Sequence, residues 1–405
     1  MVSADPRSGT SEGSSFVSDT LFRRLVAVRR ELHEHPELSF HEERTASVLE
    51  SALAAVGVRQ VERVGRTGLV ARIPGRDRDL PPVAIRGDID ALPIQEATGL
   101  AFASRTTGVM HACGHDVHAA WALGAAALLV ERPAEGDVLI VFQPAEEVGE
   151  GALAILSSGI LDNVRAIFGA HVDRRFTVGQ IVAQAGPLAA SADNFAIDLL
   201  GHGAHGARPH ESADPIVGLA ALVTALQTIV SRRVNPATPA VVTVGIISAG
   251  SAPNVIPDCA SLQGTLRATD DDTRATLREA LRGIATHVAA AHGLEARITL
   301  GMGIPPVVNG EDTAAWAATA AVSVLGTGSV VPLGTPNMAA EDFAFYLQRI
   351  PGCFLRVGAR RPGEPVIAAH SPQFDVAEEA IGIGASVLAE AARRASAALR
   401  GARHG

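Results

Sequence analysis

Side chains able to bind metal or move protons are concentrated in two short stretches of the chain. Residues 111–118 read HACGHDVH, and Glu146-Glu147 follow in a second stretch. The thiol of Cys113 and the imidazole of His115 are good ligands for zinc and neighbouring divalent ions, and the glycine between them lets the backbone turn so that both point at one centre. Beside a cation, one carboxylate of a pair can ligate while the other accepts a proton from water. The two stretches together indicate metal-dependent hydrolysis.

Three predicted strands place these residues at one edge of a sheet. Strand 83–86 runs towards Asp90, strand 138–142 runs into the glutamate pair, and strand 166–170 runs into His171. Open α/β sheets bind their ligands in the crevice beyond the carboxyl ends of the strands. We therefore expect residues far apart in the sequence to meet in one cleft, which is stronger evidence for a site than any one of them alone.

The order of strands and helices predicts an α/β domain interrupted by a smaller α+β domain. Short apolar strands that alternate with helical patterns indicate a mostly parallel sheet covered on both faces. From residue 188 the order changes to β-α-β-β-α-β, which is typical of a ferredoxin-like unit, and after residue 300 the first pattern resumes. We therefore expect a disordered tail (1–19), a metal-binding catalytic domain (20–187 and 301–405) and an inserted domain (188–300).

Composition excludes several classes of protein. The chain has 405 residues with 34 basic and 43 acidic side chains, a formal net charge of −9, and it contains no lysine. The lack of lysine excludes Schiff-base chemistry and a Walker phosphate loop, and the acidic balance argues against nucleic-acid or anionic-membrane partners. The longest apolar stretch, 216–230, is shorter than the ~20 residues of a membrane-spanning helix. Three cysteines are too few for a disulfide framework, and with no signal-peptide pattern we expect a cytoplasmic protein.

A glycine-rich stretch at residues 201–206, GHGAHG, formally matches a dinucleotide-binding fingerprint. We reject this match because Pro209 and Pro215 delay the next helix, so that no helix N-terminus meets the glycines. In addition, no acidic residue follows at the required spacing. A flexible loop that carries His205 and closes over a cleft is the favoured interpretation.

A series of short motifs gives the chain a specific resemblance to a known family. In order they read HPEL (35–38), RGDIDALP (86–93), MHACGHD (110–116), FQPAEE (142–147), RPH (208–210) with DPI (214–216), NVIPD (254–258), GTLR (264–267), EDF (341–343) and HSP (370–372). The sequence resembles the metal-dependent amidohydrolases that include N-acyl amino acid, hippurate and auxin-conjugate hydrolases. This resemblance, which covers nearly the whole chain, implies hydrolysis of the amide bond between an acyl group and an amino acid.

The resemblance also implies a metal centre. Two adjacent divalent ions, Zn²⁺ or Mn²⁺ with Co²⁺ and Ni²⁺ also compatible, would be held by Cys113, His115, Glu147, His171 and His370. Glu146 would be the general base, and Asp90 would support the cluster through a histidine. The ligand that bridges the two ions is left open.

Further residues are implied in the inserted domain, which corresponds to the family's lid and dimerisation domain. His205 and Asn254 would polarise the scissile carbonyl, and Arg267 would bind the substrate carboxylate through its planar fork. A homodimer through this domain follows by analogy. In some relatives the lid histidine reaches the site of the partner subunit, and the sequence alone leaves open in which subunit His205 acts.

Three other interpretations stay open. A dipeptidase or carboxypeptidase could use the same pair of metal ions on a different substrate. A thiol hydrolase could use Cys113 as nucleophile with a histidine as base, although this leaves Glu147, His171 and His370 without a role. A catalytically inactive amino acid-binding relative is the third, and the retained Glu146 argues against it.

Overall fold

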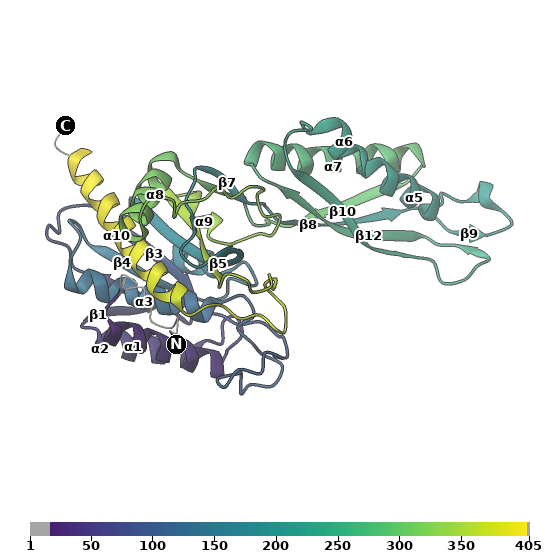
Figure 1. The fold of residues 1–405 in the computed structure, drawn as a ribbon. Helices are drawn as coiled ribbons and strands as arrows, with labels where there is room; N and C mark the ends of the chain where they lie inside the picture. The colour runs from purple at the N-terminus through teal and green to yellow at the C-terminus, as the bar shows by residue number, and fades with distance from the viewer. Residues whose placement is uncertain (1–16, 403–405) are drawn as a thin grey trace, which may run out of the picture.

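The larger part of the chain is built around one seven-stranded sheet (Figure 1). The computed structural model describes residues 17–402. Across the sheet the strand order is β1-β2-β4-β3-β5-β15-β6. The strands are β1 (Gln60–Val64), β2 (Gly68–Ile73), β3 (Val83–Asp88), β4 (Val138–Gln143), β5 (Ala166–Thr177), β6 (Ile181–Val182) and β15 (Gly352–Arg360).

The sheet is parallel only at its centre, so the expectation of a mostly parallel sheet was wrong at the edges. The neighbours β4, β3, β5 and β15 run parallel, whereas β1–β2, β2–β4 and β15–β6 are antiparallel. The short connection from β1 to β2 explains why these two strands are antiparallel. Gly65 and Arg66 both have positive φ and form a tight turn there. A connection this short joins only antiparallel neighbours.

Helices cover both faces of the sheet with different apolar clusters. One face packs against α1 (Asp19–Glu34), α2 (Glu43–Ala55), α3 (His115–Glu131), α8 (Glu311–Leu325) and α10 (Glu379–Ala402). The other face packs against α4 (Gly151–Ser157), α9 (Ala344–Leu347) and the two-stranded ribbon of β7 (Gly186–Ala189) and β14 (Val307–Asn309). The α/β fold class is therefore confirmed.

The helix α3 is apolar on nearly all sides. It is buried between the sheet and the helices α1 and α10, which pack against it. A helix without a polar face is stable only in such a buried position.

Most of the predicted tail, residues 1–19, lies outside the described residues. Its end was misplaced, since Asp19 is the first residue of α1 and the hydroxyl of Ser18 caps that helix by accepting from the Leu21 N–H at 3.2 Å.

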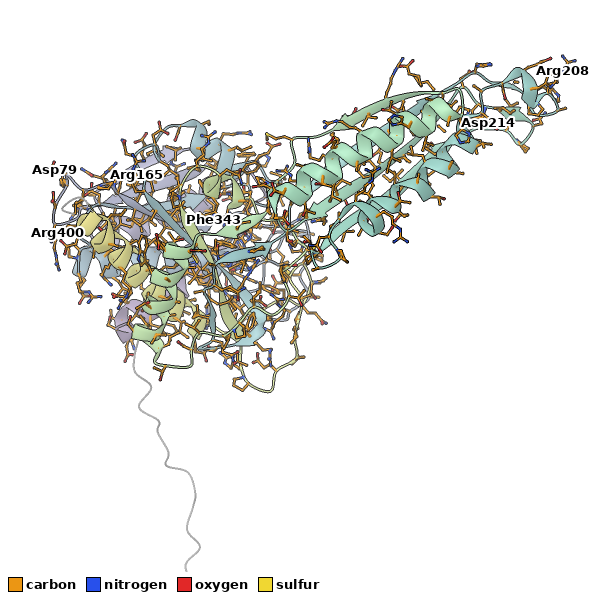
Figure 2. The ribbon with its side chains drawn as sticks, turned by 90° about the horizontal axis from the view of Figure 1, so that it is seen from above. Asp79, Arg165, Arg208, Asp214, Phe343 and Arg400 are labelled. Carbon is orange, nitrogen blue, oxygen red and sulfur yellow. The ribbon has the colours of Figure 1, made fainter. Side chains whose placement is uncertain are left out.

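Residues 193–300 form a second unit with its own sheet and core. Its strands β8 (Asp193–Leu200), β10 (Ala240–Ala249), β12 (Cys259–Ala268) and β13 (Glu295–Leu300) are all antiparallel, in the order β10-β12-β8-β13. The helices α5 (Pro215–Leu226), α6 (Thr228–Arg233) and α7 (Asp271–Ala291) pack on one face of this sheet. The unit extends from the body of the molecule as a separate lobe (Figures 1 and 2).

Two connections join this lobe to the body, and they run side by side. Ala192 and Ile304 exchange backbone hydrogen bonds of 3.0 and 2.9 Å. Next to them, the buried carboxylate of Asp193 is paired with the guanidinium groups of Arg274 and Arg278. The junction is therefore a short two-stranded segment held by ion pairs at the base of the lobe.

The far end of the lobe carries a small extra hairpin-like pair that sequence patterns did not predict. The strands β9 (Ala204–His205) and β11 (Val255–Ile256) pair there. The short 3₁₀ helix η1 (Pro209–Glu211) directly follows β9 in the chain. Arg208 marks this end in Figure 2, whereas Phe343 lies in the body.

None of the helices between residues 17 and 402 combines the length and the apolarity needed to cross a bilayer.

Candidate metal centre

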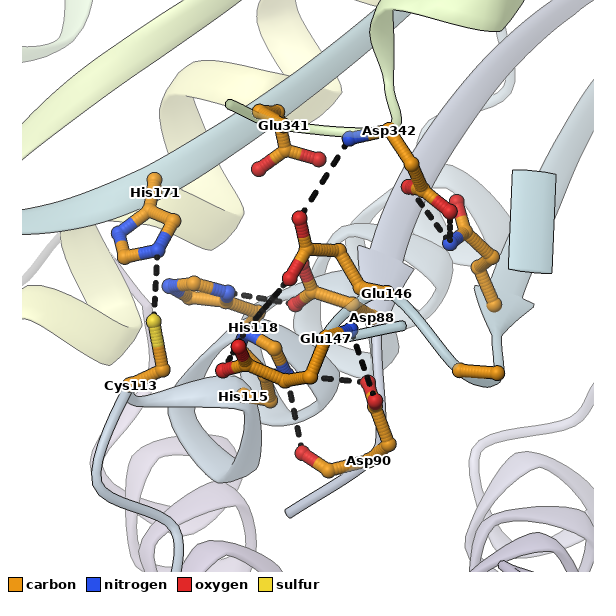
Figure 3. Close-up of polar contacts among 12 residues, drawn as sticks. Asp88, Asp90, Cys113, His115, His118, Glu146, Glu147, His171, Glu341 and Asp342 are labelled. Carbon is orange, nitrogen blue, oxygen red and sulfur yellow. Dashed lines mark hydrogen bonds and ion pairs between the residues drawn. The ribbon is translucent and has the colours of Figure 1, made fainter. Parts of the chain in front are cut away.

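The five predicted metal ligands lie together at the carboxyl end of the central strands, and Figure 3 shows four of them, Cys113, His115, Glu147 and His171. The Cys113 Sγ is 3.2 Å from the His171 Nε2. The Glu147 carboxylate lies between two histidines, with Oε1 3.8 Å from the His115 Nε2 and Oε2 3.5 Å from the His370 Nε2. The ligand atoms form overlapping groups of three, each within 4.8 Å. The structure thus brings residues from positions 113 to 370 into one cluster.

Local backbone geometry brings Cys113 and His115 to the same point. Gly114 between them has φ +90° and precedes the first residue of α3. A Cβ at this position would lie 2.6 Å from the Val172 Cγ2, so the left-handed conformation and the close approach both require glycine. His171 was expected just after its strand, but it lies within β5, because pairing with β15 extends that strand to Thr177.

Hydrogen bonds fix the tautomers of two of the predicted histidine ligands. The His115 Nδ1 is 2.9 Å from the backbone oxygen and 3.2 Å from the carboxylate Oδ1 of Asp90. The His171 Nδ1 is 2.7 Å from the backbone oxygen of Val172. In each ring Nδ1–H must donate, so Nε2 presents a lone pair to the cluster. Metal-binding histidines show this arrangement.

Two atoms of the cluster are buried without a hydrogen-bond partner. They are the His115 Nε2 and the Glu147 Oε1. An unsatisfied buried polar atom costs free energy, and these two face each other inside a group of sulfur, nitrogen and oxygen donors. That donor set suits zinc and other first-row divalent ions. The residues present therefore fit divalent metal ions.

The environment of Cys113 bears on the thiol-hydrolase interpretation. Burial, and next the negative charge of Glu147, raises the pKa of the Cys113 thiol well above its ordinary value. A nucleophilic cysteine needs the opposite, a thiolate stabilised by its surroundings. The side chain is thus suited to ligating a cation, which displaces its proton, and not to attacking a substrate by itself.

Asp90 positions two ligands from behind. Its carboxylate accepts hydrogen bonds from the Glu147 N–H at 3.0 Å and from the Ser39 hydroxyl at 2.7 Å, besides its contact with His115. Burial alone would raise the pKa of the Asp90 carboxyl, but these hydrogen bonds outweigh it and lower the pKa. Asp90 is therefore a charged carboxylate that orients both His115 and Glu147.

Glu146 lies at the margin of the cluster, next to the predicted ligand Glu147. Its Oε2 is 3.9 Å from the His115 Nε2, and its Oε1 accepts from the Asp342 N–H at 3.4 Å. Burial and the negative charges of Glu341, Asp342 and Glu147 raise the pKa of its carboxyl well above the ordinary value. A carboxylate with a raised pKa accepts and returns protons closer to neutral pH.

A buried network behind Glu146 was not predicted from the sequence. The guanidinium of Arg86 is fully buried, with its partners at 2.5–3.0 Å. These partners are the side chains of Asp88, Gln143, Glu341 and Asp342. The available signal was the charge of Arg86 inside an apolar strand, because a buried arginine requires acidic partners.

His118 and His111 lie near the cluster but are not among the five predicted ligands. The His118 Nδ1 lies 2.6 Å from the Asp88 Oδ1, and its Nε2 accepts from the Val172 N–H at 3.0 Å, so both nitrogens are occupied. Neither ring nitrogen of His111 has a hydrogen-bond partner, and burial lowers the pKa of this imidazole to about 4. His111 is thus a neutral buried ring.

The three predicted residues of the lobe do not share one location. His205 and Asn254 are exposed neighbours at the far end, where His205 pairs with Val255 and the Gly206 N–H donates to the Asn254 oxygen at 2.8 Å. Within this chain that end lies away from the metal cluster (Figure 1). Arg267 lies at the base instead, where its Nη1 donates to the Met338 backbone oxygen at 3.0 Å.

Comparisons with known proteins agree with the geometry. The model of peptidase family M20/M25/M40 matches residues 84–394. An N-acetyl-L-cysteine deacetylase of Bacillus subtilis is 40% identical over 93% of this chain and 89% of its own length. An IAA-amino acid hydrolase of Arabidopsis thaliana is 38% identical over 92% of this chain and 86% of its own.

A solved structure extends the agreement to three dimensions. The crystal structure of a dinuclear metal-binding peptidase of Bacillus subtilis from the M20 family has a TM-score of 0.83 at 36% identity. The match covers 95% of this chain and 99% of that one. The resemblance to metal-dependent amidohydrolases is therefore confirmed over the catalytic body and the lobe alike. The chain is a hydrolase that belongs to peptidase family M20/M25/M40.

Proposed function

We propose that this protein hydrolyses the amide bond of N-acyl amino acids with the help of two divalent metal ions. The observation that carries the proposal is the buried cluster of sulfur, nitrogen and oxygen donors beside Glu146, in which His115 Nε2 and Glu147 Oε1 lack partners. The names of the relatives, a deacetylase of N-acetyl-L-cysteine and a hydrolase of IAA-amino acids, support this substrate class.

The roles of the residues follow from their positions. Five side chains would hold the ions: Cys113, His115, Glu147, His171 and His370. Bound divalent ions supply Lewis-acid activation of water and of the substrate carbonyl. Glu146 accepts the proton of the attacking water, whose oxygen adds to the amide carbon. When the C–N bond breaks, Glu146 returns a proton to the leaving amine, so that a carboxylic acid and a free amino acid are released. Asp90 keeps His115 and Glu147 in position.

The donor chemistry supports a choice of metal. A thiolate and three imidazoles favour zinc, and the carboxylate also accommodates manganese, cobalt or nickel. We propose Zn²⁺ or Mn²⁺ as the native ion. A ligand thiol requires a reducing environment, and the three cysteines are free, which supports the cytoplasm as the compartment.

Arg267 is the proposed partner of the substrate carboxylate. Among residues 17–402 the Arg267 guanidinium has one hydrogen bond, from its Nη1 to the Met338 oxygen, so its remaining N–H groups can bind a carboxylate. The bond to Met338 ties the base of the lobe to the segment that leads to Glu341. A fork of N–H donors binds a carboxylate in a fixed orientation, which would direct the adjacent amide towards Glu146.

His205 and Asn254 are proposed to act in the site of a second copy of the chain. Both are exposed at the end of the lobe that is distant from their own metal cluster. In a homodimer formed through the lobe they would polarise the scissile carbonyl of the partner's substrate. The edge strand β10 supports such a dimer, because Ile246 and Ile247 are each 57% exposed on it, and apolar edges of this kind are otherwise protected.

A peptidase acting on dipeptides is the second candidate, favoured by the solved structure named a dinuclear metal-binding peptidase. The test is metal analysis of the purified protein, followed by parallel assays of N-acetyl amino acids, hippurate and dipeptides. Release of amino acid from N-acyl substrates, lost on chelation and restored by added metal, supports the proposal. A preference for dipeptides would contradict it, and no turnover with metal present would indicate an amino acid-binding protein.

A further inference from the structure

One buried arginine of the body has no polar partner. Arg356 on β15 is 6% exposed, and its Nε is buried without a hydrogen bond. No hydrogen bond or ion pair joins its guanidinium to any residue from 17 to 402. Arg86, equally buried, contacts four side chains. Apart from the Phe354 ring, whose centroid is 5.5 Å from the Arg356 Cζ, no contact among the described residues compensates this charge, and burying such a cation is unfavourable. The contrast with Arg86 indicates that Arg356 is completed by a group from outside the chain.

The position of Arg356 in the sheet places it beside the metal centre. In the parallel pair of β15 and β5 it lies opposite His171, and residues that are opposite in a sheet project to the same face. Phe354, two residues earlier, packs in the apolar cluster on that face, whereas Leu355 and Val357 pack on the other. The guanidinium is therefore on the face that carries the ligand His171.

The charges around Arg356 are already committed to other groups. Burial lowers the pKa of this guanidinium, and the charges that act on it most strongly are those of Asp173, Glu341 and Arg175. Asp173 forms an ion pair of 2.7 Å with Arg175. Glu341 binds Arg86 and the Phe343 N–H, both at 3.0 Å. Both acids act on Arg356 through space, but each forms its close ion pair with another arginine.

We propose that Arg356 binds a second carboxylate of the substrate. The inference rests on the proposed function, in which Arg267 binds the carboxylate that every N-acyl amino acid carries. Arg267 contacts the segment before Glu341 at Met338, and Arg356 lies within electrostatic range of Glu341 in the same segment. Two arginines with free donors, one opposite His171 in the sheet and the other bound to the segment that leads to Glu341, match two anionic groups. The substrate class is thus an N-acyl amino acid whose second carboxylate is on its side chain or on its acyl group.

Matched substrates test the charge. N-acetyl-methionine is compared with N-acetyl-glutamate, which has a second carboxylate on its side chain. N-butyryl-methionine is compared with N-succinyl-methionine, which has the second carboxylate on its acyl group. We expect the wild type to prefer one diacid over its neutral counterpart. Arg356→Met should reduce this preference about ten-fold or more, because a charge-assisted hydrogen bond is lost, and the loss should appear in KM.

Two further variants separate recognition from structure. Arg356→Lys keeps the charge and should restore part of the preference. Arg360→Met makes the same substitution on the same strand, where Arg360 donates to the backbone oxygens of Arg174 and Glu364, and should leave the preference unchanged. Thermal unfolding of Arg356→Met should show a melting temperature at or above that of the wild type, since the variant removes an unpaired buried charge.

A binding measurement keeps this inference distinguishable from the proposed function. Calorimetry with succinate and glutarate is done on the metal-loaded wild type and on Arg356→Met. Weaker binding to the variant, in a protein that hydrolyses no N-acyl amino acid, would support Arg356 and reject the proposed function. Hydrolysis with equal losses for neutral and acidic substrates, or with no change in either, would overturn the role of Arg356 and leave the proposed function standing.

Discussion

The metal centre in the body and the histidine-bearing end of the lobe are built in opposite ways. In the body, most ligands are buried or nearly so, and several are held by a second residue, as Asp90 holds His115 and Glu147. At the far end, His205 and Asn254 are exposed and bind only their own hairpin. The body thus contains a full set of candidate metal ligands, whereas the lobe end offers exposed polar side chains far from that cluster. Under the proposed function, these side chains would act in a second copy of the chain.

The largest effect is expected from Glu146→Gln, which tests whether the body alone supplies the proton acceptor. The glutamine side chain keeps the shape of the glutamate but cannot take a proton, so kcat should fall by about 10²–10⁴ while metal content is unchanged. Steady-state kinetics and metal analysis of the same preparation measure both. Glu150→Gln, in the same loop and exposed, is the control. Near-normal turnover of Glu146→Gln would refute the role.

The next prediction concerns the lobe end. His205→Ala should reduce kcat by about 10²–10³, the value of a lost oxyanion donor, without changing metal content. If His205 acts in the partner's site, mixing His205→Ala with Glu146→Gln should restore activity that neither has alone, because the mixed dimer contains one intact site. No recovery after subunit exchange would place the action of His205 elsewhere and remove the contrast between the two regions.

A smaller effect is expected from Asp90→Asn, which tests how the body holds its ligands. The amide binds His115 and the Glu147 N–H less strongly than a carboxylate, so metal affinity should fall about 10- to 100-fold. Competition with a chelator gives the affinity, and kcat at saturating metal should change less. Ser39→Ala removes a single hydrogen bond to Asp90 and should weaken metal binding less than Asp90→Asn does.

The smallest effect on activity, and one confined to stability, concerns His33 in the body. Burial alone would lower the pKa of its imidazole, but hydrogen bonds with Asp116 and Glu96 raise it from 6.5 to about 9. Because the folded pKa is the higher one, the stabilisation is present below pH 6.5 and is lost as pH rises through 9. We expect the free energy of unfolding to fall by at most about 3 kcal/mol over this range.

Urea denaturation at a series of pH values measures this change. His33→Gln keeps a hydrogen-bonding side chain but has no titrating group, so its stability should be lower and should not decline between neutral pH and pH values above 9. A wild-type protein whose stability is constant over the same range would show that the His33 ion pairs do not stabilise the body.

The sequence was informative where chemistry follows a strand. Asp90, Glu147 and His171 could be placed at one edge because the carboxyl ends of parallel strands meet there. His370 could be assigned only from the family resemblance, because it lies in a loop, is about half exposed and has φ +67°, with no periodic pattern to place it. The network of Arg86 joins residues more than two hundred positions apart, which no local pattern encodes.

The distance of His205 from its own metal cluster was also beyond the sequence. The GHGAHG stretch suggested a loop over a cleft, but the length of β8 and β12 carries it to the opposite end of the lobe. The antiparallel edge of the large sheet depends in the same way on a turn, Gly65-Arg66, that periodicity does not register. Sequence patterns thus predicted elements well, and the distances between them poorly.

The paired connections at Ala192 and Ile304 have a mechanical consequence. Both connections lie side by side at the base of a long lobe. A small rotation of the lobe about this base would therefore move the distal pair of β9 and β11 over a much larger distance. The five predicted ligands are all on the body side of that pivot, so a swivel would leave the distances between them unchanged. The angle between lobe and body could then control the entry of substrate and the release of product, while the residues of the metal cluster stay in place.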